Sequence, residues 1–546
     1  MKRAQFPRLR IALAASTMAI ALGGVAVAVS MQTADAQHSR PGEVKTSGGW
    51  VRGVAATNYG EYLGIPYAAP PVGALRLMAP RPAAGWSGVR DATQFGSRCV
   101  QGSGWDPGYE NPILTEDCLY LNVYVPEHVR PGGPVLVWIH GGGYTGGAGQ
   151  DTDPRKYIDQ SGSIYVTVNY RLGALGFLDL PELGDGAGNF GLLDQQAALR
   201  WVHDNINAFG GNPNNVTIAG QSAGGGSVCD QLSSPTAAGL FQRAIIVSGG
   251  CSMTAQSAAH TASQAFVTTL GCTDPATVLA CVRGKSTAQI LQAQQAAPGV
   301  RPAVGGGAFP LDPAVAVPAG KINRVPVVNG QVHDERRLFV FQGNDYLGHP
   351  VTADSYATTV RSTYGADADK ILAAYPVSAY PTPGIALATV QSDAASYTRQ
   401  ELDSQFAQWV PTYAYEFAEE QTPQFYSIYR LQQAGGVAAH FDFGATHVDD
   451  LGYLWEYLGH TPPYSDDQLA LSDQMITFWS QFQDRGDPNA DNVPTWPRFT
   501  SAQGDWMELK GCVTSEAGSR PPAACSAASA NYVSDHKLAL WATVLG

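Results

Sequence analysis

Residues 216–224 read Val216-Thr217-Ile218-Ala219-Gly220-Gln221-Ser222-Ala223-Gly224, an apolar run followed by the pattern G-x-S-x-G. The run predicts a strand and the small residues after it can begin a helix, which is the setting of a strained turn that exposes a nucleophilic serine. Glycines suit such a turn because a Cβ atom beside it would collide with the chain. The chain holds 61 glycines, so the pattern also arises by chance and the surrounding sequence must decide.

Short β-rich apolar runs alternate with helical patterns along the chain. One helical stripe covers residues 192–206 and stops at Gly210-Gly211, between the second and third runs. This alternation predicts an α/β fold with a mostly parallel sheet flanked by helices. The runs occupy residues 135–139, 163–168, 216–219, 244–247, 325–328 and 426–429.

The N-terminus has the order of a secretory signal peptide. Basic residues come first, an apolar stretch follows over residues 11–29, and Ala34-Asp35-Ala36 resembles a cleavage site. We therefore predict a signal peptide over 1–36, no membrane attachment after cleavage and secretion of residues 37–546; an uncleaved anchor is the alternative. The mature part is expected to be a single domain with inserted helical regions at about 254–324 and 344–424.

The charge balance argues against nucleic acid as a partner. The chain has a formal net charge of −13, and removal of four basic side chains and one acidic side chain with residues 1–36 leaves −16. Phosphate binding requires a basic surface, so a small molecule is the expected partner. The composition does not indicate an oligomeric state.

Eight cysteines in an exported chain favour disulfides over metal ligation, and none of them forms a C-x-x-C pair. Three pairs bracket short segments, which leaves two cysteines to pair with each other or stay free. Proximity alone does not establish these pairings. The short pairs are Cys99 with Cys118, Cys272 with Cys281 and Cys512 with Cys525, and the remaining two are Cys229 and Cys251.

A nucleophilic serine needs a base and a group that orients the base. His447 lies in a small-residue loop after the expected strand at 426–429, and Asp334 and Glu335 follow the strand at 325–328. Parallel strands that end at one sheet edge bring such loops together. Either acid can orient His447, and the chain order of nucleophile, acid and base is that of α/β-hydrolases.

A glycine run supplies candidate donors for an oxyanion. His140-Gly141-Gly142-Gly143 directly follows the strand at 135–139, and glycine lets backbone N–H groups approach a substrate closely. With the amide of Ala223 these groups predict an oxyanion hole, although a flexible turn is the alternative for the run alone. We interpret His140 as structural and predict no metal site, because no partner ligand lies nearby in sequence.

Several motifs in this order resemble the type-B carboxylesterases, the carboxylesterase, cholinesterase and lipase family of the α/β-hydrolase fold. The likeness extends over nearly all of the chain after residue 36. The residues that carry it are 63–73 (LGIPYAAPPVG), 116–123 (EDCLYLNV), 140–143 (HGGG), 169–173 (NYRLG), 209–213 (FGGNP) and 222–224 (SAG).

The resemblance implies Ser222 as the nucleophile, Glu335 as the triad acid and His447 as the base. It also implies that Gly142, Gly143 and Ala223 donate to the oxyanion, that no metal or organic cofactor takes part, and that disulfides join Cys99 to Cys118 and Cys272 to Cys281. The choice of Glu335 over Asp334 rests on this resemblance.

The sequence departs from the family pattern in three places. Gln221 replaces the acid that usually precedes the nucleophile, which removes a negative charge near the expected base. Arg336, with Arg337 after it, replaces the glycine that usually follows the triad acid, and the two arginines either face solvent or recognise an anionic group. Residues 304–308 replace the usual Asp-Gly before the acid strand.

These inferences together predict a secreted serine carboxylic ester hydrolase that acts through an acyl-enzyme on neutral esters of moderate acyl length. The alternatives are a lipase for long-chain esters, a cholinesterase-like enzyme and a noncatalytic binding protein on the same fold. Aromatic residues near the motifs are candidates for lining the ester pocket. They are Tyr144, Phe309, Phe339, Tyr453 and Trp455.

Overall fold

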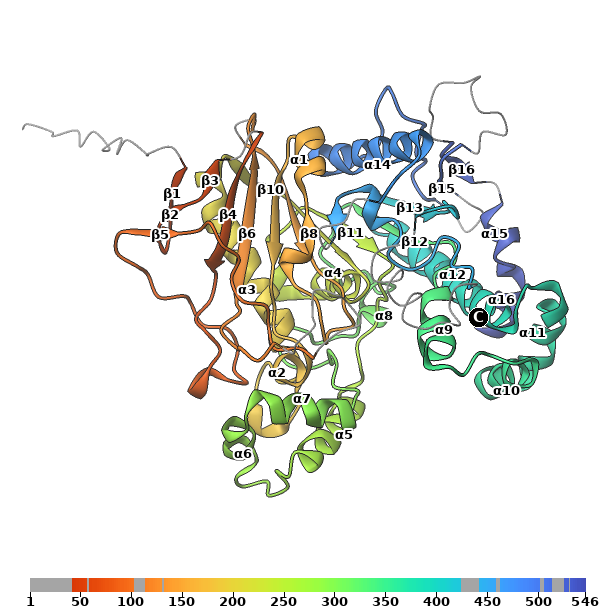
Figure 1. Cartoon of the computed structure of the whole chain (residues 1–546), viewed down its shortest axis with the longest axis horizontal. Helices are drawn as coiled ribbons and strands as arrows, with labels where there is room; N and C mark the ends of the chain where they lie inside the picture. Colours follow the sequence, from red (N-terminus) through yellow and green to blue (C-terminus); the bar gives the residue numbers. More distant parts are fainter. Residues whose placement is uncertain are drawn as a thin grey trace, which may run out of the picture. The chain divides into compact units, whose positions relative to one another are not determined.

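An eleven-stranded sheet carries the motif loops (Figure 1). The computed structural model describes residues 42–55, 58–102, 113–129, 132–423, 441–457, 462–500, 505–512, 525–529 and 531–546. In sheet order the strands are β16 (Ala527–Ser529), β15 (Trp506–Leu509), β13 (Thr412–Phe417), β12 (Val327–Val332), β11 (Arg243–Val247), β10 (Gly211–Gln221), β7 (Gly133–Ile139), β9 (Ile164–Val168), β6 (Tyr120–Pro126), β4 (Tyr59–Pro66) and β3 (Val54–Ala55).

The middle of this sheet is parallel and its ends are antiparallel. Strands β9, β7, β10, β11, β12, β13 and β15 pair in parallel, whereas β3, β4, β6 and β16 join through antiparallel pairs. The predicted α/β fold with a mostly parallel sheet is therefore confirmed. Five of the six expected strands correspond to β7, β9, β10, β11 and β12, and the sixth, at 426–429, lies outside the described residues.

One strand differs from the sequence-based expectation for residues 344–424. Helices occupy much of that segment, but Thr412–Phe417 forms β13 beside β12. Every residue of β13 is buried, so the strand shows no alternation of polar and apolar residues. Its aromatic residues favour a strand, but a short run buried on both faces is difficult to distinguish from part of a buried helix by periodicity.

Helices cover both faces of the sheet (Figure 1). Helices α3 and α4 pack against β10, and α4 also contacts β7 and β11, while α14 packs against α1, β7 and β10. The fully buried run of β7 reflects this double cover. The helices are α1 (Arg155–Ser161), α2 (Gly173–Phe177), α3 (Phe190–Asn205), α4 (Ala223–Ser233), α5 (Gln256–Thr269), α6 (Val278–Gly284), α7 (Thr287–Ala296), α8 (Pro313–Ala316), α9 (Arg337–Gly343), α10 (Ala353–Tyr364), α11 (Ala368–Ala374), α12 (Pro383–Ala407), α14 (Asp466–Arg485), α15 (Tyr532–Asp535) and α16 (Leu538–Val544).

Within the described ranges, five short strands lie outside the main sheet. Strands β1 (Glu43–Thr46), β2 (Gly49–Arg52) and β5 (Val89–Asp91) form a three-stranded sheet, and β8 (Thr152–Asp153) pairs with β14 (Glu456–Tyr457). No helix among the described residues combines the length and apolar character needed to cross a membrane.

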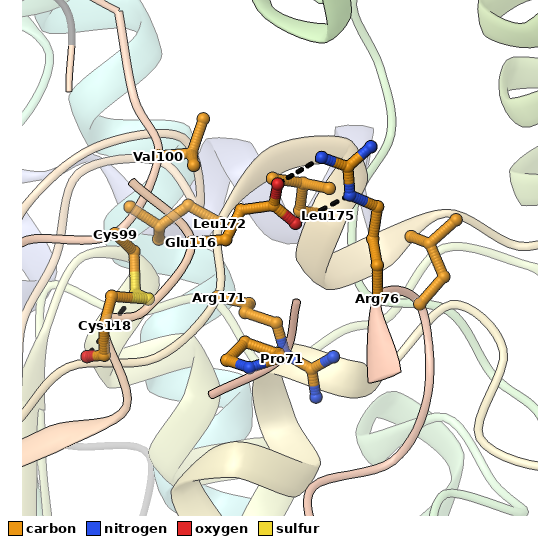
Figure 2. Close-up of a pocket in the computed structure, with 10 residues that line it drawn as sticks. Pro71, Arg76, Cys99, Val100, Glu116, Cys118, Arg171, Leu172 and Leu175 are labelled. Atoms are coloured by element: carbon orange, nitrogen blue, oxygen red, sulfur yellow. Dashed lines mark hydrogen bonds and ion pairs between the residues drawn. A yellow bond between two sulfur atoms is a disulfide. The ribbon is translucent and has the colours of Figure 1, made fainter. Parts of the chain in front are cut away.

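Arg76 ties the segment after β4 to the α6 region, and Figure 2 shows its contact with Glu116. Its Nε donates to Glu116 Oε2 at 2.7 Å, and its Nη1 donates to the carbonyl oxygens of Arg283 and Lys285 at 3.0 and 2.6 Å. The disulfide between Cys99 and Cys118 lines the same small pocket. The guanidinium is satisfied by protein acceptors, so this part of the motif region serves the architecture.

Four disulfides use all eight cysteines. They include the two pairs implied by the resemblance and the two that the sequence left open. Cys229 lies in α4, the helix that begins at the residue after Ser222. Its bond to Cys251 fixes that helix to the loop after β11. The pairs are Cys99 with Cys118, Cys229 with Cys251, Cys272 with Cys281 and Cys512 with Cys525.

Candidate active site

Ser222 occupies a sharp turn between β10 and α4. Its backbone has φ 56° and ψ −121°, a sparsely populated conformation for a residue with a Cβ atom. A Cβ atom on Gly220 would lie 2.4 Å from the backbone of Gly224, and one on Gly224 would lie 2.0 Å from the Ile139 carbonyl oxygen. Both glycines of G-x-S-x-G are thus required by backbone contact, as the sequence predicts for a nucleophile turn.

Hydrogen bonds hold this turn against the neighbouring strand. The Ser222 N–H donates to the Val247 carbonyl at 2.9 Å, and the Gly226 N–H donates to the Ser222 carbonyl at 2.9 Å. The first bond joins the turn to Val247, the last residue of β11, and the second is a hydrogen bond of the first turn of α4. The serine is therefore fixed from both sides, which suits a side chain that must act in one orientation.

The glycine run after β7 lies beside Ser222. A Cβ atom on Gly141 would be 3.2 Å from Ser222 Cβ and 2.8 Å from the Gln221 carbonyl oxygen. Gly142 and Gly143 have φ values of 103° and 61°, which favour glycine. Because β7 and β10 pair in parallel, their following loops meet at one edge of the sheet. As the first residue of α4, Ala223 has an N–H with no acceptor inside its own helix.

His140 serves this loop as a buried structural residue. Its Nδ1 lies 2.8 Å from the Gly141 carbonyl oxygen, and its ring stacks on Tyr170 with 4.4 Å between ring centroids. The Tyr170 hydroxyl donates to the His140 carbonyl oxygen at 2.9 Å. Burial lowers the pKa of His140 to about 4, so its imidazole is neutral at physiological pH.

Glu335 and His447 meet at the carboxyl ends of β12 and β13. The Nδ1 atom of His447 contacts Glu335 Oε1, and the Ser248 hydroxyl donates to Glu335 Oε2 at 2.9 Å. Both side chains are nearly fully buried. Burial raises the pKa of the Glu335 carboxyl, but His447, the Arg336 charge and the Ser248 hydrogen bond outweigh it and hold that pKa below its usual value.

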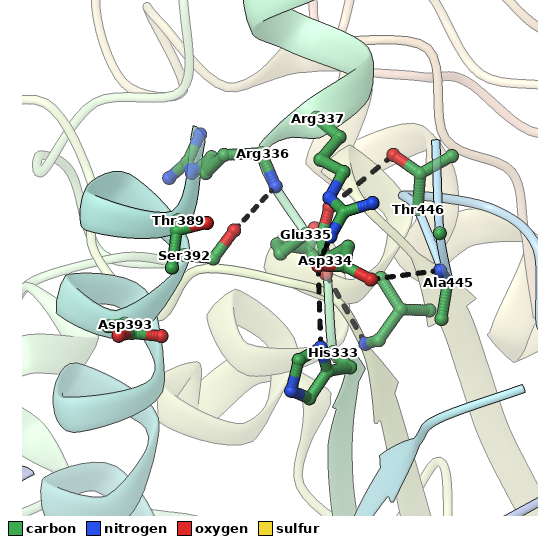
Figure 3. Close-up of polar contacts among 12 residues, drawn as sticks. His333, Asp334, Glu335, Arg336, Arg337, Thr389, Ser392, Asp393, Ala445 and Thr446 are labelled. Carbon is green, nitrogen blue, oxygen red and sulfur yellow. Dashed lines mark hydrogen bonds and ion pairs between the residues drawn. The ribbon is translucent and has the colours of Figure 1, made fainter. Parts of the chain in front are cut away.

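Asp334, the other acid that the sequence left open, turns to a different partner. It accepts a hydrogen bond from the Ala445 N–H at 3.1 Å and forms an ion pair with Arg337 at 2.9 Å (Figure 3). Arg337 also pairs with Asp442 at 2.9 Å. Asp334 thereby joins the loop after β12 to the loop that carries His447. Sequence reasoning alone could not separate the two neighbouring acids.

Gln221 lies against the free nitrogen of His447. Its amide nitrogen is 2.9 Å from His447 Nε2, and both side chains are buried. An N–H at Gln221 facing this nitrogen fits a neutral imidazole whose Nδ1–H donates to Glu335; the amide orientation is assigned from that bonding pattern. The side chain that departs from the family pattern therefore touches the nitrogen that would accept the serine proton in the expected triad.

Arg336 and Arg337, taken in the sequence as one pair, have different surroundings. Arg337 forms ion pairs with two carboxylates, those of Asp334 and Asp442. The Arg336 guanidinium instead lies over Phe339, at 5.5 Å from the ring centroid. Phe339 in turn lies 4.8 Å from the His447 ring. Arg336 has φ −98°, so this backbone position does not require the glycine usual in the family.

The five candidate pocket aromatics also differ in their surroundings. Phe339 contacts His447 and is 38% exposed, so it can contact a substrate. Phe309, Tyr453 and Trp455 are buried core residues. Tyr144 packs edge-on against Phe177 with 5.3 Å between centroids. Among the five, Phe339 is the residue that this geometry associates with the site.

Sequence reasoning missed Ser248, whose hydroxyl hydrogen-bonds to Glu335, the expected triad acid. It follows β11 directly and has a φ of 47°, and its hydroxyl orients Glu335. Its position at a strand end beside β10 was the available indication. A cavity of about 190 Å³ adjoins this group and is lined by Ser248, Gly249, Gly250, Cys251, Gln331, Glu335, Arg336, Ala395, Thr398, Arg399 and Leu402.

Comparisons with known proteins give one consistent result. The profile of the carboxylesterase family matches residues 40–521. Para-nitrobenzyl esterase of Bacillus subtilis (strain 168) is 33% identical over 503 residues, which cover 87% of this chain and 96% of that protein. Fumonisin B1 esterase of Sphingopyxis macrogoltabida is 33% identical over 527 residues and 90% of each chain. A solved thermophilic pNB esterase superimposes with a TM-score of 0.70 at 29% identity, over 86% of this chain and 96% of that one.

Proposed function

The chain belongs to the carboxylesterase family and is a serine ester hydrolase, and we propose that Ser222, His447 and Glu335 form its catalytic triad. The observation that carries the proposal is the contact of His447 Nδ1 with Glu335 at the sheet edge where Ser222 occupies its strained turn. A carboxylate at Nδ1 orients the imidazole and leaves Nε2 to accept a proton.

The reaction begins when His447 Nε2 takes the proton of the Ser222 hydroxyl. For this step the Gln221 amide moves away from Nε2, and Ser222 Oγ forms a bond to the ester carbonyl carbon. The carbonyl oxygen becomes an oxyanion and accepts hydrogen bonds from the N–H groups of Gly142, Gly143 and Ala223. Each such donor is worth about 3–4 kcal/mol in comparable sites.

Collapse of this intermediate releases the alcohol, which takes its proton from His447 Nε2. The acyl group remains on Ser222 Oγ. A water molecule then gives a proton to His447 and attacks the acyl carbon, and the acid leaves as Ser222 regains its proton. The buried Glu335 carboxylate stabilises the imidazolium in both halves of the cycle.

The substrates proposed are neutral carboxylic esters of moderate acyl length. Phe339 beside His447 supplies an apolar wall for a neutral ester, and the Arg336 guanidinium lies over the Phe339 ring. A profile of kcat/KM on p-nitrophenyl esters from acetate to palmitate, with Ser222→Ala as the control, tests this. An optimum at short or middle chains supports the proposal, an optimum at palmitate replaces it with a lipase, and serine-independent turnover refutes the triad.

Export completes the proposal. We infer that residues 1–36 are a cleaved signal peptide and that residues 37–546 are one secreted hydrolase domain. Four disulfides suit an oxidising compartment. N-terminal sequencing of protein recovered from culture medium tests both points, because a first residue near Gln37 is expected. An intact N-terminus on cell-bound protein would favour the anchor instead.

A further inference from the structure

Two histidines and two acids cluster outside the proposed triad. We call this the His536 cluster, and its members are His333 after β12, Asp393 in α12, Glu416 in β13 and His536 after α15. His536 Nδ1 lies 2.8 Å from Asp393 Oδ1, and His536 Nε2 lies 2.5 Å from Glu416 Oε1. The rings of His333 and His536 have centroids 4.9 Å apart.

Three of these residues present metal-ligating atoms to one point. One ligand atom from each of His333, Glu416 and His536 lies within 4.8 Å of the other two. Ligands at the usual zinc bond lengths of about 2.0–2.2 Å stand about 3.4 Å apart in a tetrahedron. His536 Nε2 and Glu416 Oε1 lie 2.5 Å apart, below that value, and the His333 ligand atom lies within 4.8 Å of the other two, so rotamer adjustments on the order of 1 Å bring the three atoms into coordination.

Asp393, the fourth member, has the position of a second-sphere partner that would hold a metal-bound histidine. Metal-bound histidines commonly donate their second ring N–H to a carboxylate, which fixes the ring and its tautomer. Asp393 Oδ1 at His536 Nδ1 is such a partner, and it leaves Nε2 directed at Glu416. The Tyr375 hydroxyl donates to Asp393 Oδ2 at 2.7 Å and holds this carboxylate in turn.

Burial and access also suit a bound cation. His536, Glu416 and Asp393 are buried, and a bound cation would take over the charge compensation that the His536 ring gives to the two buried carboxylates. The His333 side chain is 33% exposed, which gives an ion a route from solvent and a place for a water ligand. His333 Nδ1 makes no hydrogen bond within the described residues and lies 3.4 Å from Asp334 Oδ1.

We propose that His333, Glu416 and His536 bind a divalent transition metal, with zinc the ion that best fits two imidazoles and one carboxylate. The ion would link the C-terminal helices to β13 and to the residue two positions before Glu335, so it acts on stability and on the placement of the triad acid. It takes no part in the ester chemistry, and its binding displaces the proton shared by His536 and Glu416.

The test is zinc binding by the full chain after removal of metal with a chelator. Titration calorimetry at pH 8 with zinc chloride, together with metal analysis after dialysis, is expected to give one zinc per chain and a higher melting temperature. His333→Ala removes a partly exposed ligand and should abolish stoichiometric binding. Asp393→Asn should weaken it about 10–100-fold by loosening His536.

The matched control is His349→Ala, which removes an exposed histidine outside the cluster. This variant should bind zinc as the wild type does. Absence of stoichiometric zinc from the wild type, or binding that survives His333→Ala, would overturn the proposal. Because zinc binding and melting temperature are measured without any ester, the outcome is independent of the proposed triad.

Discussion

Substitution of Gln221 by Glu places a negative charge beside the nitrogen that is proposed to accept the serine proton. The Gln221 amide nitrogen is 2.9 Å from His447 Nε2, so a carboxylate oxygen at this position would lie about 3–4 Å from it. Two unit charges 4 Å apart interact with about 4 kcal/mol at an effective dielectric of 20 and with about 1 kcal/mol in water. Each 1.36 kcal/mol corresponds to one pH unit.

The new charge favours the protonated imidazole, and only the neutral imidazole can accept the Ser222 proton. The acid limb of the kcat/KM profile should therefore move to higher pH by about 1–3 units, the upper part of the range fitting the burial of both side chains. Activity falls at pH 6, while at pH 9 it equals or exceeds that of the wild type because the imidazolium is better stabilised.

The assay is kcat/KM for p-nitrophenyl acetate between pH 5 and 9, read at an isosbestic wavelength of nitrophenol. Gln264→Glu, on the exposed face of α5, makes the same chemical change far along the chain from the site and should leave the profile unchanged. An acid limb that stays in place in Gln221→Glu, or that moves to lower pH, refutes the assigned contact between Gln221 and His447.

Three further variants test the surroundings of the site. Burial raises the pKa of Asp403 to about 7 from an unfolded value near 3.9, so its contribution to stability is present below about pH 4 and is lost as pH rises to 7. The free energy of unfolding of Asp403→Asn, measured in urea, should therefore rise by about 3 kcal/mol relative to that of the wild type between pH 5 and pH 8. A difference between the two proteins that stays constant with pH would contradict this. Double replacement of Cys229 and Cys251 by Ser opens a 22-residue loop and should lower the free energy of unfolding by about 3 kcal/mol, so an unchanged urea midpoint argues against a formed disulfide. Gly224→Ala drives a Cβ atom to 2.0 Å from the Ile139 carbonyl oxygen and should abolish esterase activity in purified protein, whereas full activity would show that the turn is built differently.

The sequence predicted the parts of the fold that depend on local pattern. Continuous apolar runs such as 135–139 and 244–247 predicted strands that the structure contains, and the helical stripe at 192–206 predicted α3. Strand β13 was missed because Thr412–Phe417 is buried on both faces and carries a glutamate, which removes the alternation that marks most strands. The local rule failed where tertiary burial decides.

In the candidate site, too, residues with a local sequence signature could be predicted and residues defined by tertiary contacts could not. Ser222 and the glycine run have local signatures, since close backbone contact admits only glycine beside them. The partner of His447 lies 112 residues away, and the carboxylates of Asp334 and Glu335 differ only in direction, which side-chain packing sets. The contact of Gln221 with His447 likewise depends on the position of a distant loop. The family resemblance supplied the choice of Glu335 that spacing did not.

The central claim is that Ser222 carries the acyl group, and covalent labelling tests it most directly. Purified wild type, Ser222→Ala and Ser227→Ala are treated with a fluorophosphonate ester, and the adduct is located by peptide mass spectrometry. Ser227 is the matched control because it is a buried serine in α4, five residues away. The account predicts one adduct, on Ser222, in the wild type and in Ser227→Ala, with none in Ser222→Ala. An adduct on another residue, or ester hydrolysis that persists in Ser222→Ala, would contradict it.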